Sequence, residues 1–149
     1  MFYLAGPCDT ENRTSMVQIA KFLREKGAEL YCPWELKIED AWDYSQEEWA
    51  HMVFEKDIAA LNSCTAVIMI SLGRKSTAGT NWEQGYCYAK GIPVHVIQIN
   101  SEPTSIMTYC GSTSFINALH NYGGIKGELR WILEHPLEES HGKCRTVLT

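Results

Sequence analysis

The chain has 149 residues, of which 45% are apolar and 21% are charged, and its formal net charge is −5. That length fits one domain with a sizeable core, and the composition is ordinary for a globular protein. A negative chain without a Lys/Arg cluster lacks the basic surface that nucleic-acid polymers require, although helix N-termini and backbone amides can still hold a small anion. No apolar run is long enough to cross a bilayer, so we expect no membrane contact.

The N-terminal sequence and the cysteines favour a cytoplasmic protein. MFYLAGPCDT lacks the basic region that opens a signal peptide, and we expect it to form a strand at once. The six cysteines are scattered without a Cys-x-x-Cys pair, which is typical of reduced thiols in the cytosol. The five histidines form no close pair, and no motif implies a metal or an organic cofactor.

Strand and helix patterns alternate along most of the chain. The apolar runs predict strands over residues 2–6, 28–32, 65–71 and 94–99. The longer periodic segments predict helices over residues 14–27, 46–62 and 80–90, with a polar, Trp-rich loop over 33–45. Beyond Asn100 we expect a loop with one helical turn over 101–115, short helices over 115–123 and 125–135, and a polar tail over the last dozen residues.

This alternation predicts the fold class. Near-continuous apolar strands separated by helices indicate a parallel sheet covered on both faces. We therefore expect residues 1–149 to form a single doubly wound α/β domain, flavodoxin- or Rossmann-like, with four to five strands. In such sheets ligands bind where strands end, so site residues are sought at 5–9, 33–35, 71–80 and from 99 onward.

Glu83 is the most informative candidate. It lies in AGTNWEQGYCYAKGIPV, between a buried strand and the next one, where small residues leave room for a ligand. If Glu83 lies in the first helical turn, the helix dipole favours its ionised form, which suits a nucleophile or a base. Thr80 and Glu83 also fit a capping box with a purely local role.

A lone carboxylate rarely suffices for glycosyl or acyl transfer, so a second ionisable group is expected nearby. Asp57, in EKDIAAL, is the best candidate, and a solvated helix residue is the alternative. Tyr3 on the first strand needs a partner for its hydroxyl, which a carboxylate or the backbone can supply. Arg13 can pair with an anion or lie exposed on the surface.

The other motifs exclude several site types. AGPCDT follows the first strand, but it lacks the spacing of Gly-x-Gly-x-x-Gly, and neither a P-loop nor a Gly-x-Ser-x-Gly elbow is present. The aromatic residues at 34, 42, 44 and 49 can stack on a planar base or simply pack in a core or lid.

Over roughly residues 2 to 110 the chain resembles the nucleoside 2-deoxyribosyltransferase family, small α/β proteins that cleave N-glycosidic bonds of nucleosides or nucleotides. The resemblance rests on FYLAGP, on the helix that carries Asp57, on GTNWEQGYCYAKGIPV and on the SIM of residues 105–107. The third motif is the most specific, with Gly-Thr-x-x-Glu-x-Gly followed by Gly-x-Pro-Val.

The resemblance implies roles for the three candidates. Glu83 matches the nucleophile that forms a covalent sugar–enzyme intermediate, Asp57 the acid that assists departure of the base, and Tyr3 the residue that orients the nucleophile. The chemistry would be that of a retaining glycosidase. The family contacts the base where Trp34 and Glu35 lie. Its substrate pocket would also include Gly6, Arg13, Gly79 and Met107.

One departure from the family pattern concerns the sugar 5′ position. Nucleoside-using members carry an aspartate six residues before the nucleophile, where this chain has Thr77. A second family position, an asparagine of a neighbouring subunit, aligns with Ser105. The 5′-monophosphate hydrolases of the family have hydroxyl residues at both places, and hydroxyls do not repel a phosphate.

The sequence therefore predicts an enzyme that cleaves an N-glycosidic bond, with a 5′-monophosphate hydrolysed to base and sugar phosphate. The alternatives are a transferase that moves 2-deoxyribose between bases and a catalytically silent nucleotide-binding module. The expected partners are a small nucleoside or nucleotide and a second copy of the chain, because Ser105 would complete the neighbour's site.

Overall fold

The computed structural model describes residues 1–120, 124–142, 144 and 146–149. Its centre is one sheet in which every paired strand runs parallel to its neighbours, in the order β2-β1-β3-β4-β5-β6. The strands are β1 (Phe2–Ala5), β2 (Leu30–Tyr31), β3 (Ala66–Ser71), β4 (Val94–Gln98), β5 (Ser114–Asn117) and β6 (Ser140–His141). The predicted parallel α/β fold with helices on both faces is confirmed.

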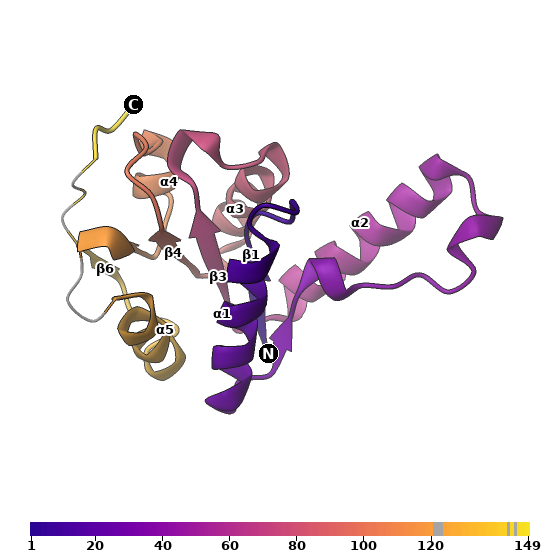
Figure 1. The fold of residues 1–149 in the computed structure, drawn as a ribbon, viewed down its shortest axis with the longest axis horizontal. Helices are drawn as coiled ribbons and strands as arrows, with labels where there is room; N and C mark the ends of the chain where they lie inside the picture. The colour runs from indigo at the N-terminus through magenta and orange to yellow at the C-terminus, as the bar shows by residue number, and fades with distance from the viewer. Residues whose placement is uncertain (121–123, 143, 145) are drawn as a thin grey trace.

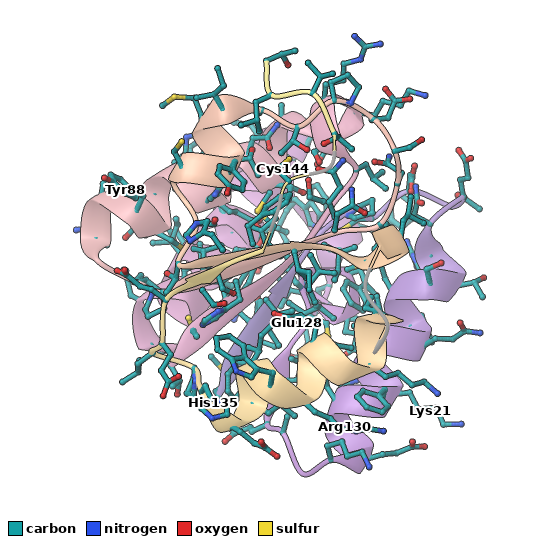
Figure 2. The ribbon with its side chains drawn as sticks, turned by 90° about the vertical axis from the view of Figure 1, so that its left-hand side faces the viewer. Lys21, Tyr88, Glu128, Arg130, His135 and Cys144 are labelled. Carbon is teal, nitrogen blue, oxygen red and sulfur yellow. The ribbon has the colours of Figure 1, made fainter. Side chains whose placement is uncertain are left out.

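Helices cover both faces of this sheet. They are α1 (Arg13–Glu25), α2 (Gln46–Ser63), α3 (Ala78–Lys90), α4 (Ile106–Cys110) and α5 (Gly124–Glu134). Figure 2 shows the sheet nearly edge-on, with α5, which carries Glu128 and Arg130, on one side and Tyr88 of α3 on the other. Short 3₁₀ turns link the elements at Pro33–Glu35, Ala41–Asp43, Gly73–Lys75 and Ala118–His120.

The alternation of side chains along β1 divides the core in two. Leu4 belongs to a cluster that α1 and α5 cover, with Leu23 and Leu129 among its buried members. Tyr3 belongs to a second cluster, which α2 and α3 cover, with Leu61 and others. Because successive side chains of a strand point to opposite faces, one short strand serves both clusters.

The sheet has six strands, two more than the four whose positions the sequence predicted. Residues 115–117 were expected to open a short helix, but they lie in β5, where His95 pairs with Ser114 in the register with β4. Ser114–Asn117 has four residues and is mostly buried, so its apolar content does not distinguish a strand from a helix. Residues 121–123 of that expected helix lie outside the described residues.

The expected polar tail is also partly wrong. Ser140–His141 forms β6, which pairs with β5 through residues that carry no strand signal of their own. Farther on, Thr104 bridges to Leu148, and the amide of Thr104 donates to the carbonyl of Val147 at 2.8 Å. Residues 143 and 145 of the tail lie outside the described residues. Backbone pairing, which the amino-acid pattern does not report, holds this segment.

One helix departs from the compact arrangement. The N-terminal part of α2 and the segment before it extend away from the sheet, on the right in Figure 1. None of the helices in the described ranges combines the length and hydropathy that a bilayer-spanning helix needs.

Candidate active site

The candidate site lies at the carboxyl edge of the sheet, where β1 ends between its neighbours β2 and β3. β1 pairs with β2 on one side and with β3 on the other, which makes this edge the switch point at which doubly wound sheets bind ligands. Gly6, buried just after β1, accepts a hydrogen bond through its carbonyl from Thr80 Oγ1 at 3.3 Å. That bond ties the start of α3 to the end of β1.

The start of α3 differs from the prediction. Thr77, and not Thr80, is the N-cap, because its side chain accepts from the amide of Thr80. The helix therefore begins at Ala78, and Glu83 lies in its second turn. The alternative of a capping box between Thr80 and Glu83 is therefore wrong, and Glu83 is available for a role outside the helix.

Tyr3 and Glu83 are in contact across the second core cluster. The Tyr3 hydroxyl donates to Glu83 Oε1 at 3.2 Å. Burial raises the pKa of Glu83 to about 7, the charge of Asp57 adds to that effect, and the Tyr3 hydrogen bond opposes it. Burial therefore dominates at this carboxyl group, and Glu83 lies beyond the first turn of α3, where the dipole effect falls off. Burial is also the main cause of a raised pKa for Tyr3, so its hydroxyl stays a donor.

Asp57 also accepts a hydrogen bond from a tyrosine, Tyr31, which was not predicted from the sequence. Tyr31 donates from its hydroxyl to Asp57 Oδ1 at 2.8 Å, and burial raises the pKa of Asp57. The Tyr31 ring stacks on the Tyr3 ring, with centroids 5.3 Å apart. Tyr3 and Tyr31 are register partners on adjacent strands. Two tyrosines at equivalent positions of neighbouring predicted strands were the signal that could have revealed the pair.

The two carboxylates share one hollow between α2 and α3. Its volume is about 400 Å³, and eight residues line it: Phe54, Asp57, Ile58, Leu61, Ala78, Gly79, Trp82 and Glu83. Phe54 and Trp82 meet edge to face at its rim, with ring centroids 5.5 Å apart. The hollow therefore combines an apolar wall with two carboxyl groups, a combination typical of small-molecule sites.

This arrangement suits nucleophilic and acid–base chemistry. Two carboxyl groups with raised pKa values, each oriented by a tyrosine, can divide the roles of nucleophile and proton donor. In the described ranges no group of three or more His, Cys, Asp or Glu side chains could hold a metal ion.

The loop between β3 and α3 is pinned at its base. Gly73 has φ of +60°, and a Cβ there would lie 2.6 Å from the Pro103 carbonyl oxygen. Lys75 and Arg74 both pair with Glu102, at 2.7 Å and 3.3 Å. The charge that these two cations offer to a ligand is therefore already shared with a carboxylate, while Thr77 stays exposed at the start of α3.

Arg13 lies exposed at the start of α1 and donates to the Cys8 carbonyl at 3.2 Å. Its contact is with the loop that follows β1, so Arg13 shapes the turn beside Gly6. Burial is the main cause of the raised pKa of Cys8, and the negative charge of Glu83 raises it further.

The two residues expected to contact the base, Trp34 and Glu35, do not line the hollow. Glu35 binds Arg24 through both oxygens, at 2.8 Å and 2.7 Å, and this ion pair lowers its pKa. Trp34 packs against the cluster beneath α1 and α5. The contact of these residues with a base therefore stays a prediction. The nearby Trp42, Tyr44 and Trp49 belong to the extended segment and its helix.

Ser105 and Met107 lie across α3 from Glu83. Ser105 is the N-cap of α4, and both residues line a second hollow of about 360 Å³, together with Asn81, Gln84, Gly85 and Tyr88 of α3. These α3 residues form a different face of the helix from the one that carries Glu83. Within one chain, Ser105 and Glu83 are therefore on separate sides of α3.

Comparisons with known proteins find relatives of this chain in sequence and in fold. The sequence model described as nucleoside 2-deoxyribosyltransferase matches residues 2–130. A 2-deoxyribosyltransferase from Bacillus psychrosaccharolyticus superposes with a TM-score of 0.66 and 25% identity, covering 81% of this chain and 90% of that one.

Two further solved structures are similar. A conserved protein from Enterococcus faecalis V583 gives a TM-score of 0.57 at 19% identity, covering 96% of this chain and 90% of that one, which supports the fold. The CMP N-glycosidase BcmB from Clostridium botulinum gives 0.47 at 16% identity, covering 99% and 87%. No curated protein sequence matches the chain.

Proposed function

The chain belongs to the nucleoside 2-deoxyribosyltransferase family, and we propose that it cleaves the N-glycosidic bond of a nucleoside 5′-monophosphate. The observation that carries the proposal is the hollow that Glu83 and Asp57 share, with each carboxyl group held by a buried or half-buried tyrosine. Water accepts the sugar, and the products are a free base and a sugar phosphate.

The proposed first step forms a covalent intermediate. A Glu83 carboxylate oxygen attacks the anomeric carbon while the bond from that carbon to the base nitrogen breaks. The departing base takes its electron pair and a proton from the carboxyl group of Asp57. The raised pKa of Asp57 supports this role, because it favours the protonated form.

The proposed second step returns the enzyme to its initial state. Water attacks the same carbon and gives a proton to Asp57, and the ester bond to Glu83 breaks to release its carboxylate. Both displacements invert the anomeric carbon, so the sugar retains its configuration. Tyr3 acts as a positioning residue, because its hydroxyl holds one oxygen of Glu83.

The preference for a 5′-phosphate rests on the start of α3. Thr77 puts a hydroxyl where an aspartate would repel a phosphate, and the first amides of a helix have no partner within the helix. Gly79 lines the hollow one turn before Glu83, so a phosphate at this end would place the sugar beside the carboxylates.

Ser105 and Met107 are proposed to act at a neighbouring subunit's site. In their own chain α3 separates them from Glu83, and Met107 is 80% exposed. A second copy would bring the α4 hydroxyl to the phosphate end of the first copy's hollow. The active unit would then be at least a dimer.

Chromatography of a substrate panel tests the activity. The panel holds deoxynucleosides and ribonucleosides and their 5′-monophosphates, each incubated with and without a second free base. Base released from a monophosphate without an acceptor supports the proposal. A new nucleoside that forms only with an acceptor base would establish the transferase instead, and inactivity on every substrate would favour a nucleotide-binding module.

Three variants test the assigned roles. Asp57→Asn should lower kcat by about 10²- to 10⁴-fold at a similar KM, because it removes a general acid without removing a substrate contact. Thr77→Asp should shift the preference from monophosphate to nucleoside. Intact-mass measurement of acid-quenched wild type, but not of Glu83→Gln, should show a sugar adduct.

A further inference from the structure

A third hollow lies between α1 and α5, on the opposite face of the sheet from Glu83. We call it the α1–α5 hollow. Its volume is about 370 Å³, a size typical of small-molecule sites. Residues 99 and 118–119 of its lining follow β4 and β5, so it opens at the carboxyl edge of the sheet, where doubly wound folds bind ligands. It shares no lining residue with the hollow that holds Glu83, so the proposed chemistry does not use it.

The wall of the α1–α5 hollow is mostly hydrocarbon. Six of its ten lining residues are aliphatic: Ile19, Ile99, Ala118, Leu119, Ile125 and Leu129. Leu119 is 55% exposed, so part of this apolar wall faces solvent. Ser15 and Gln18, both exposed, supply the uncharged polar groups of the lining. A nucleobase buried here would leave most of its N–H and C=O groups unpaired, whereas an aliphatic chain has no such groups to satisfy.

Phe22 also lines the hollow, and three cations surround its ring. The Nζ of Lys126, itself a lining residue, lies 5.6 Å from the centre of the Phe22 ring. The Nζ of Lys26 and the Cζ of Arg130 each lie 5.6 Å from the same centre. No two of these cations can therefore be farther apart than twice that distance. This is comparable to the Debye length of about 10 Å at 0.1 M salt, so the three charges repel one another.

These cations lack a counter-charge. In the part of the chain that the structure describes, none of the three forms an ion pair. Glu25, next to Lys26 in the sequence, pairs instead with Lys21 at 3.9 Å. Figure 2 shows Arg130 of α5 and Lys21 of α1 on the same side of the sheet. On a chain with a net charge of −5, this positive patch is a local exception, and it is expected to attract an anion.

The positive patch continues the hollow by one helical turn. Lys26 follows Phe22 by four residues on α1, and Arg130 follows Lys126 by four residues on α5. Both helices connect neighbouring strands of one parallel sheet, so they run in the same direction. At 1.5 Å per residue, Lys26 and Arg130 lie roughly 6 Å beyond the level of Phe22 and Lys126. A chain that fills the hollow can therefore place a charged head group among the cations.

We propose that the α1–α5 hollow binds a medium-chain fatty carboxylate. The hydrocarbon chain lies against the aliphatic wall, and the carboxylate lies beside Lys126, Lys26 and Arg130. Two carboxylate oxygens can accept hydrogen bonds from two cations at once. Each methylene removed from water strengthens binding about fourfold. A polyanion without a chain would leave the hollow empty, and a neutral lipid would leave the positive charges uncompensated.

Titration of the ¹⁵N-labelled protein with decanoate, followed by the NMR shifts of the backbone amides, tests the proposal. The amides of Gln18, Ile99 and Lys126 should shift and saturate with a dissociation constant below about 1 mM, while those of Gly79 and Glu83 should not shift. Hexanoate, which is four methylenes shorter, should bind at least about 30-fold more weakly. Decylammonium, which has the same chain and the opposite charge, should leave these amides unshifted.

A pair of variants tests the positive patch. Lys126→Gln with Arg130→Gln should raise the dissociation constant for decanoate at least about tenfold, as for lost hydrogen bonds to a charged group. Both side chains are exposed, so the fold does not depend on them. Lys37→Gln with Lys56→Gln removes the same charge at exposed positions outside the hollow, and this matched control should stay within about twofold.

Three results would overturn the proposal. They are the lack of a saturable shift at 1 mM decanoate, equal weakening by the two pairs of variants, and shifts centred on Glu83. Because neither nucleotide nor turnover enters the measurement, its outcome does not depend on the proposed cleavage of an N-glycosidic bond.

Discussion

Under α1 and α5 the sheet meets aliphatic side chains, whereas under α2 and α3 it meets two stacked tyrosines and two carboxyl groups. Leu4 and Tyr3 are neighbours on β1, yet one belongs to the first layer and the other to the second. The first layer also buries an ionisable group, His95. Its ring nitrogens lie 2.6 Å from Ser114 Oγ and 2.6 Å from the Pro136 carbonyl, and burial lowers its pKa.

The difference between His95 and Glu83 shows what distinguishes a structural polar group from a reactive one. Both are removed from water. Both nitrogens of His95 have partners, so the neutral ring is satisfied where it lies. Glu83 has one hydrogen bond from Tyr3 and an open hollow beside it. A buried group that still faces open space can react with a ligand, and burial alone does not identify such a group.

Replacement of the carboxylate should have the largest effect. Glu83→Gln should lower turnover by on the order of 10⁴-fold or more, because an amide cannot form the ester intermediate. The same change should stabilise the fold by roughly 3 kcal/mol at pH 8, since it removes a charge whose burial is unfavourable. Denaturant unfolding and steady-state kinetics measure the two effects.

The sign of the pH dependence follows from the raised pKa of Glu83. The unfolded chain releases the Glu83 proton near pH 4, and the folded chain releases it near pH 7. Below pH 4 the Glu83 carboxyl group is protonated in both the folded and the unfolded chain, so Glu83→Gln brings no gain in stability there. The gain should grow between those values and be complete above pH 7. A gain that is equal at pH 4 and pH 8 would contradict the burial of a titrating carboxyl group.

A change in the aliphatic layer under α1 and α5 should lower stability and leave turnover unchanged. Leu23→Ala removes a fully buried side chain of α1 and should cost about 2–5 kcal/mol of unfolding free energy. The kcat and KM of the folded fraction should be unchanged, because Leu23 does not line the hollow. Val17→Ala, at an exposed position of the same helix, is the control and should change little. If Leu23→Ala lowered kcat at full folding, the two layers would not be independent.

Tyr3→Phe should shift the pH profile with an intermediate effect. The Tyr3 hydroxyl lowers the pKa of Glu83, so its removal should raise that pKa. The acid limb of kcat/KM, expected near pH 7 in the wild type, should then move to higher pH, because ionised Glu83 is the reactive form. Below the limb, activity should fall about tenfold, as for a lost hydrogen bond to a charged group. An unmoved limb would show that Glu83 does not set it.

Tyr31→Phe should have the smallest effect, a few-fold loss of kcat at unchanged KM. The Tyr31 hydroxyl lowers the pKa of Asp57, so its loss should raise that pKa and move the limb that Asp57 sets to higher pH. Tyr44→Phe removes an exposed hydroxyl and serves as the control. A loss of kcat with both limbs in place would mean that Tyr31 acts only in packing.

The sequence predicted the elements whose apolar pattern is long, and it failed where backbone pairing decides the structure. The strands around 2–6, 65–71 and 94–99 were found because their runs are nearly continuous. β6 has only Ser140 and His141, both exposed, and nothing but hydrogen bonding to β5 makes it a strand. The order of the strands in the sheet likewise depends on pairing between distant segments, which the order of elements along the chain does not specify.

The site residues likewise fall into those that the sequence predicted singly and those whose role depends on their neighbours in the fold. Tyr3, Asp57 and Glu83 were found as single residues, and the structure brings them to one place. Tyr31 was missed because its role depends on the residue beside it in the sheet, and the two tyrosines are related only when the two predicted strands are paired in register. The start of α3 was misplaced because Thr77 and Thr80 are equally good caps, and the geometry of the preceding turn chooses between them.

The pinned loop after β3 has a consequence for protein engineering. Gly73 is held in a left-handed conformation against the Pro103 carbonyl, so any other residue there would disturb the turn. Just beyond it, Thr77, Ala78 and Gly79 are exposed, and a Cβ at Gly79 would meet nothing within 4 Å. A combinatorial library that keeps Gly73 constant and randomises residues 77–79 should therefore sample new substrate preferences on an intact scaffold.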